Sequence, residues 1–171
     1  MKSARMCAFT ALLVTFIAAT AFGQESPNLA PLSSSKFEAL PGLPTCLTGA
    51  IQHGDPAKGA AVLVAKLTAG CTIPWHWHTQ NENVIMIGGK GKLEMRSEAA
   101  QNVGPGDYYF MPSKHQHQFT CVTACAFYNV IDAAFDIHFV DKDGNEIPAE
   151  QALKAAHKAG GGKAVVGQRK Q

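Results

Sequence analysis

Hydrophobic positions in the body of the chain form short runs that are separated by turn residues. The run at 60–67, Ala-Ala-Val-Leu-Val-Ala-Lys-Leu, is too apolar and too rich in β-branched residues for a surface helix. Residues 84–87 form a second apolar run, which ends in the Gly-Gly-Lys-Gly turn at 88–91. Residues 92–96 alternate between polar and apolar side chains, as a half-exposed strand does. Later strands are expected at 108–111, 118–121, 126–131 and 135–140.

Many short strands between turn signals predict an all-β sandwich or barrel. Pro148 suits the first turn of a helix, and we expect one short helix to follow it near the C-terminus. The pattern after residue 23 therefore predicts three parts. They are an extended N-terminal segment (24–58), a β-barrel (59–140), and a turn, short helix and flexible Gly- and Lys-containing tail (141–171).

The first 23 residues have a different pattern. Lys2 and Arg5 precede an uncharged apolar stretch at 6–19, and the small residues Ala21 and Gly23 then flank Phe22. This order is typical of a secretory signal peptide, although an uncleaved N-terminal anchor is the alternative. Cleavage after Gly23 would remove 23 of the 171 residues and leave 148. We therefore expect a periplasmic or secreted protein whose mature form has no membrane contact.

The charge balance argues against a nucleic-acid partner. The chain has 15 Lys and Arg residues against 13 Asp and Glu residues, and two of the basic residues belong to the predicted leader. The mature chain is thus formally neutral, without the broad basic field that binds nucleic acid or anionic lipid. No apolar run in its body reaches the length of a membrane-spanning helix.

Four cysteines follow the leader: Cys46, Cys71, Cys121 and Cys125. In an oxidising compartment they could pair in three complete ways. Only three residues separate Cys121 from Cys125, which fits a bridge across a tight turn and would leave Cys46 to pair with Cys71. Buried free thiols that merely fill space are an equally good interpretation.

The first indication of chemistry is a pair of histidines in an extended segment. Side chains alternate between the faces of a strand, so His76 and His78 share one face while Trp75 and Trp77 share the other. Glu82 follows after a turn and can return to the same place. Two imidazoles and one carboxylate suit a divalent transition metal, namely Mn, Fe, Ni, Zn or Cu.

A third imidazole has to come from another segment. Gly106 is followed after five residues by Pro112, and His117 follows after four more. His115 and His117 share a face if this segment is extended. His115 could be an acid or base beside the metal, although a place on the rim of the barrel is the alternative.

These two spacings resemble the two signature motifs of the cupin family. Residues 70–89 match the first motif throughout, and residues 106–117 match the second in part. Lys114 stands where cupins usually have glycine, and Cys121 stands where they usually have asparagine. The resemblance covers roughly residues 60–140, which is most of the expected folded part.

The resemblance implies a small cupin-type double-stranded β-helix, or jelly-roll, barrel with a metal centre inside it. It also implies the metal ligands, which would be His76, His78, Glu82 and His117. Cupins often pair through their sheets, so a homodimer is expected by analogy.

Three histidines and one glutamate leave positions open on a metal that prefers five or six ligands. We therefore expect an exported metalloenzyme that acts on a small organic molecule by dioxygenase-like or by lyase or isomerase chemistry. Glu82 and His115 are its candidate catalytic residues. The alternative is a metal-dependent module that binds or senses a small ligand without catalysis.

Overall fold

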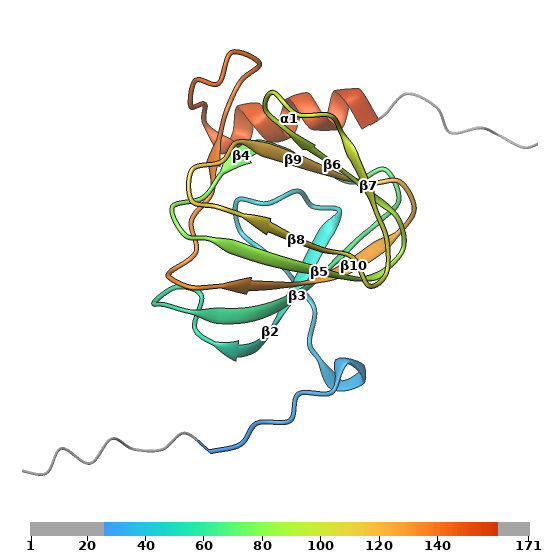
Figure 1. Ribbon diagram of the computed structural model, residues 1–171, viewed down its shortest axis with the longest axis vertical. Coiled ribbons are helices and arrows are strands. Elements are labelled where there is room, and N and C mark those ends of the chain that lie inside the picture. Colours follow the sequence, from blue (N-terminus) through green and yellow to red (C-terminus); the bar gives the residue numbers. More distant parts are fainter. Residues whose placement is uncertain (1–25, 161–171) are drawn as a thin grey trace, which may run out of the picture.

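The computed structural model describes residues 26–160, in which two antiparallel β-sheets face each other and one α-helix lies outside them (Figure 1). The fold class predicted from the sequence, an all-β jelly-roll barrel with a short C-terminal helix, is confirmed. The predicted signal peptide (1–23) and most of the predicted tail (161–171) lie outside the described residues. In the described part, no helix combines the length and the apolar character that a membrane crossing requires.

The larger sheet has six strands in the order β1-β2-β3-β10-β5-β8. Their bounds are Glu38–Ala39, Leu47–Gly54, Ala61–Leu67, Cys125–Ile131, Glu82–Gly88 and Tyr108–Met111. The smaller sheet has five strands in the order β11-β4-β9-β6-β7. Their bounds are His138–Phe139, Thr72–Trp77, His117–Cys121, Gly91–Met95 and Gln101–Val103. A 3-10 helix covers Leu32–Ser34, and α1 covers Ala149–Gly160.

The structure differs from the sequence expectation at two places. Residues 47–54 form β2, which pairs with β3 along its length, so the sheet begins before the predicted boundary at residue 59. Gly49, Gln52 and His53 interrupt the apolar pattern of this strand, and its pairing with β3 compensates for that weak local preference. The expected strand at 135–140 shortens to β11, because residues 132–137 form a loop instead.

An aromatic pair joins the two sheets in the core. Phe119 of β9 and Phe127 of β10 meet edge to face, with ring centroids 5.5 Å apart. Gly91 of β6 makes room for this arrangement, since a Cβ atom there would lie 2.3 Å from the Phe119 ring. The pair fills the middle of the barrel and forms one wall of the cavity described below.

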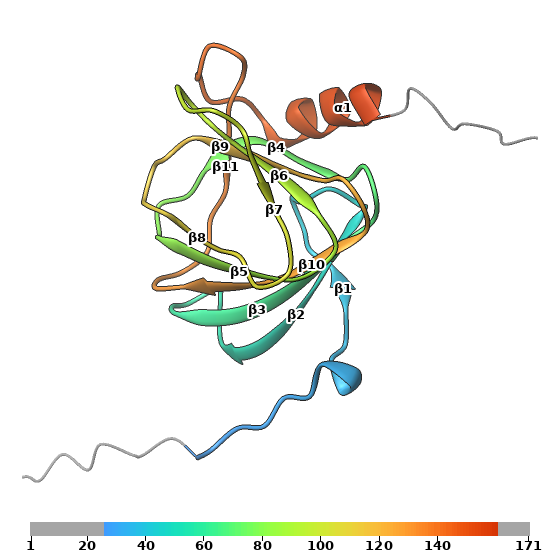
Figure 2. The ribbon, with the colours of Figure 1, turned by 45° about the vertical axis from the view of Figure 1, so that its right-hand side comes forward.

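The outer face of β4 is covered by side chains of its own sheet and by α1, which packs against this strand (Figure 2). The Arg96 guanidinium lies 4.3 Å from the Trp75 ring centroid. Trp77 stacks on His138 with the ring centroids 3.9 Å apart. Both tryptophans therefore point away from the barrel interior, as the alternation predicted, and the histidines of β4 point into it.

Two disulfides are present, and both have the pairing that the local spacing favoured. Cys121 and Cys125 bridge the end of β9 to the start of β10. Cys46 and Cys71 connect the segment before β2 to the start of β4, with a Cα–Cα distance of 5.8 Å. The Cys46–Cys71 bridge thus connects the N-terminal segment to the strand that leads to the two histidines.

The two bridges should contribute unequally to stability. A disulfide stabilises mainly by lowering the conformational entropy of the unfolded chain, and this effect grows with the length of the closed loop. The Cys46–Cys71 bridge spans a sequence separation of 25 and the Cys121–Cys125 bridge a separation of 4. Replacing Cys46 and Cys71 by alanines should lower the free energy of unfolding by about 3 kcal/mol. Replacing Cys121 and Cys125 should lower it by about 2 kcal/mol. Urea denaturation of the oxidised proteins measures both values, and the reverse order would contradict this explanation.

Candidate metal centre

Three buried histidines meet inside the barrel. His76 of β4 lies directly opposite His117 of β9 in the antiparallel ladder, so both side chains point to the same face of the smaller sheet. His78 follows one residue after the end of β4. One ring nitrogen of each of the three lies within 4.8 Å of the others. The sheet register therefore gathers three imidazoles from two neighbouring strands.

Glu82 approaches the same place from the opposite sheet. It is the first residue of β5, and only 5% of its surface is exposed. Its Oε2 atom lies 3.3 Å from Nε2 of His78 and 3.4 Å from Nε2 of His117. The structure thus brings together all four residues that the sequence predicted as ligands. Their binding of a metal stays a prediction.

Backbone carbonyl groups fix the orientation of the three imidazoles. Each Nδ1 atom lies within hydrogen-bond distance of one carbonyl oxygen: Pro74 for His76 (2.6 Å), Asp136 for His78 (2.5 Å) and His115 for His117 (2.9 Å). A carbonyl oxygen can only accept, so each Nδ1 carries the proton and donates it. In a neutral imidazole the Nε2 atom then bears a lone pair, as a metal ligand requires.

Burial favours the neutral form of His76 and His78, while Glu82 favours its ionised form. Burial holds the pKa of His76 well below its ordinary value, and burial also lowers the pKa of His78. Burial alone would raise the pKa of Glu82. The neighbouring His78 and His117 and a hydrogen bond from Asn129 outweigh it, and the pKa of Glu82 is lowered overall.

The donor set fits a metal ion. Imidazole and carboxylate lone pairs face one another, and such acceptors need a shared positive charge between them. Ligand bonds of about 2.0 to 2.1 Å place neighbouring ligand atoms about 3.0 to 3.4 Å apart around one ion. The two Nε2–Oε2 distances at Glu82 are of that size. These residues could therefore hold one divalent transition metal.

Asn129 of β10 holds Glu82 in place. Its Nδ2 atom donates a hydrogen bond to Oε1 of Glu82 at 2.6 Å, while its Oδ1 atom is buried and has no hydrogen-bond partner among the described residues. The carboxylate therefore sets the orientation of the amide. The sequence analysis missed this residue. The available signal was a single amide among the apolar residues of a buried strand.

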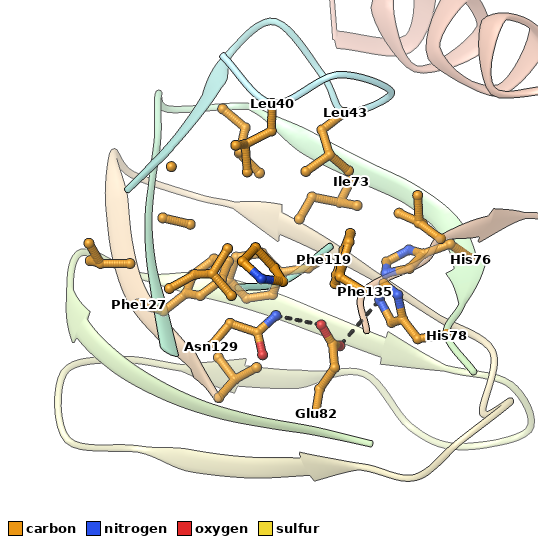
Figure 3. A pocket seen from close by; sticks show the side chains of 18 of the residues that line it. Leu40, Leu43, Ile73, His76, His78, Glu82, Phe119, Phe127, Asn129 and Phe135 are labelled. Carbon is orange, nitrogen blue, oxygen red and sulfur yellow. Dashed lines mark hydrogen bonds and ion pairs between the residues drawn. The ribbon is translucent and has the colours of Figure 1, made fainter. Parts of the chain in front are cut away.

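A cavity of about 270 Å³ opens beside the histidines (Figure 3). Its remaining walls are mostly aliphatic and aromatic. Leu40, Leu43 and Ile73 surround one side, and Phe135 lies beside His78 with ring centroids 5.0 Å apart. A small molecule inside this cavity would contact the metal centre at one end and apolar side chains elsewhere.

Tyr109 of β8 also lines the cavity. Burial raises the pKa of its phenol well above the ordinary value, and the nearby Glu82 carboxylate adds to this effect. The phenol therefore keeps its proton at neutral pH and can donate a hydrogen bond.

His115, the second predicted catalytic residue, lies outside the cavity lining. Its Nε2 atom is 3.8 Å from a carboxylate oxygen of Glu98, and about a third of the side chain is exposed. The contact of His115 with the site is through its backbone carbonyl, which accepts from His117. This position matches the rim alternative.

Comparison with known proteins identifies a domain and several similar folds. The cupin domain family model matches residues 63–131. Dimethylsulfoniopropionate lyase DddQ of Ruegeria pomeroyi is 32% identical over 74 residues, which are 42% of this chain and 35% of that protein. The chain thus matches only about a third of the length of this curated relative.

Two solved structures show the likeness of fold. The polyketide cyclase RemF of Streptomyces resistomycificus superposes with a TM-score of 0.59 at 19% identity, covering 75% of this chain and 99% of the cyclase. The DddQ structure from Ruegeria pomeroyi superposes with a TM-score of 0.51 at 16% identity, covering 67% of this chain and 61% of the lyase.

The position of Asn129 predicts a role in metal affinity. Asn129→Ala removes the donor to Glu82 and should weaken metal binding by about 10- to 100-fold, the usual cost of losing a group that orients a ligand. Competition with a chromophoric chelator measures this affinity.

Asn83→Ala is the matched control, because Asn83 lies on the other face of β5, where its Oδ1 atom accepts a hydrogen bond from the Tyr108 hydroxyl at 2.7 Å. This variant should change metal affinity by no more than about twofold. Equal effects of the two substitutions would contradict the assigned role of Asn129.

Proposed function

Residues 63–131 match the cupin domain family, and from this premise we propose that the chain is a metal-dependent enzyme acting on a small organic molecule. One observation carries the proposal. Three imidazole Nε2 atoms and the Glu82 carboxylate converge at one end of an apolar cavity. A purely structural metal needs no such cavity beside it, whereas a reactive centre does.

The metal would be Mn, Fe, Ni, Zn or Cu, held by His76, His78, Glu82 and His117. When bound, it would supply Lewis acidity to an oxygen-bearing substrate. Four protein ligands are fewer than the five or six that several of these metals accept, which leaves room for substrate or water.

The chain's own residues prepare the site for this chemistry. Asn129 fixes the carboxylate of Glu82, and three backbone carbonyls fix the imidazoles. Phe135 packs on His78 and helps to exclude water from that side. The protonated phenol of Tyr109 lines the same cavity and can donate a hydrogen bond to a bound oxygen atom.

Two reaction classes agree with these groups: oxygen-dependent cleavage, and a lyase or isomerase step. The similarity to a dimethylsulfoniopropionate lyase favours the second class for part of the chain. Dimethylsulfoniopropionate therefore belongs in the substrate panel, beside enolisable carbonyl compounds and catechols.

Turnover by protein loaded with single metals tests the proposal. The apoprotein, reloaded with each of the five metals, should convert a member of the panel with at least one of them, as followed by oxygen uptake and product analysis. Glu82→Gln should lower kcat/KM by about 100-fold or more, because a ligand and its charge are lost. Glu98→Gln removes a carboxylate near His115 and should leave the rate unchanged.

Absence of turnover with every metal would contradict the enzyme proposal, and so would full activity of Glu82→Gln where turnover is found. A ligand-induced change in the metal spectrum without product would instead favour a binding or sensing module.

We further propose that the protein is exported to the periplasm or secreted. Its two disulfides suit an oxidising compartment, and its first 23 residues have the order of a signal peptide. We also propose a homodimer, supported by apolar side chains on the outer face of β5 and β8. Ile85, Tyr108 and Phe110 are 40%, 58% and 48% exposed there.

Fractionation of the native cells, followed by purification of the protein from the fraction that contains it, tests both points. Mass spectrometry should show a chain of 148 residues, because cleavage after Gly23 removes 23 of 171. Analytical ultracentrifugation should give twice the mass of this chain. An uncleaved cytoplasmic chain would exclude export, and a monomeric mass at micromolar concentration would exclude the dimer.

A further inference from the structure

The walls of the cavity carry almost no charge away from the metal centre. Among the residues that line it, Glu82 is the only acidic residue, and there is no lysine or arginine. Apart from the four predicted ligands, only Tyr109 and Asn129 bring a polar side chain to the lining. A ligand in this cavity therefore meets hydrocarbon over most of its surface.

The two polar groups suit neutral partners rather than ions. The Nδ2 atom of Asn129 already donates one hydrogen bond to Glu82, and the amide is a neutral group that cannot balance a full charge. The Tyr109 hydroxyl is one neutral group, which cannot balance a full charge. An ammonium or carboxylate group placed far from the metal would be removed from water without a partner, and this cost weakens binding strongly.

The volume of the cavity limits the size of the ligand. A cavity of about 150 Å³ with apolar walls is enough to hold benzene. The cavity of about 270 Å³ therefore has room for one ring with a short side chain. In Figure 3, His76 and His78 lie at one side, while Leu40, Leu43 and Ile73 lie across the cavity from Glu82.

From these observations we infer the substrate class: a molecule no larger than one ring with a short side chain, with oxygen donors at one end and an uncharged, apolar body at the other. The oxygen end takes the open positions of the metal, and the body fills the side walled by Leu40, Leu43 and Ile73. This inference rests on the proposed function, because it needs a metal at the four predicted ligands. It excludes sugars, phosphorylated compounds and substrates with a charged tail, dimethylsulfoniopropionate among them, so turnover of that member of the panel would contradict the inference.

Binding of a matched series of catechols to the protein without its predicted leader (residues 24–171) tests the inference. Zinc is the metal to load, because it has no redox chemistry that would consume a catechol. Equilibrium dialysis first measures zinc binding itself. Calorimetry under argon then compares catechol with its 4-methyl, 4-ethyl and 4-propyl derivatives. Analogues of equal length that end in a carboxylate or an ammonium group complete the series.

Each added methylene should lower Kd by about fourfold until the cavity is filled, as expected for burial of one CH₂ group. The carboxylate and ammonium analogues should bind at least about tenfold more weakly than the alkyl compound of equal length. Zinc binding with a flat response to chain length, or with equal affinity for charged tails, overturns the inference and leaves the metal site intact. Failure to bind zinc or any of the other four metals overturns the proposed function and the inference together.

A charge-reversal variant adds a second readout. Leu43 lines the apolar side and is half-buried, so Leu43→Arg places a cation where the substrate tail is expected. The carboxylate analogue should then gain at least about tenfold in affinity, and 4-propylcatechol should lose affinity. Ile51→Arg is the matched control, because Ile51 is 55% exposed and does not line the cavity. An equal gain in both variants would show a general charge effect and overturn the inference.

Discussion

The structure depends on one electrostatic constraint: lone pairs from three imidazoles and one carboxylate point at a common centre inside an apolar barrel. Acceptors that face one another in a low-dielectric interior destabilise the fold unless a cation lies between them. The Nδ1 bonds to backbone carbonyls make this arrangement definite, because they fix the tautomer of all three histidines. The four residues are therefore placed so that they could share one positive charge, which a bound metal would supply.

The jelly-roll architecture makes this convergence possible because the ligands come from facing sheets. His76 and His117 are neighbours across one ladder, and Glu82 reaches them from the other sheet. A register irregularity in β4 between Ile73 and His76 occurs just before the first ligand. Such an irregularity re-aims the side chains that follow it, which is a common feature beside functional sites.

Most strands and the four residues that meet in the barrel could be predicted because their signals lie in short motifs, while the binding of a metal by these residues stays a prediction. Alternation and turn residues located most strands, and the histidine spacing located the centre. The pairing of β2 with β3 depends on contacts between segments, so the broken pattern around Gly49 concealed it. Asn129 meets Glu82 only because β10 and β5 are neighbours in the sheet, although 47 residues separate them in sequence. The position of His115 likewise depends on the three-dimensional fold, because the loop before β9 places it.

The loop at 132–137 connects the wall of the cavity to the orientation of a ligand. Phe135 faces the cavity, while the backbone carbonyl oxygen of the next residue, Asp136, accepts a hydrogen bond from Nδ1 of His78. The Asp136 carboxylate also accepts from the backbone of Thr79, and Phe135 donates from its backbone to Pro56 across the mouth of the barrel. A displacement of Phe135 by a bound molecule would move the carbonyl that holds His78. The packing that excludes water and the hydrogen bond that directs the imidazole thus belong to one segment, so the shape of the apolar wall and the geometry of the centre cannot change independently.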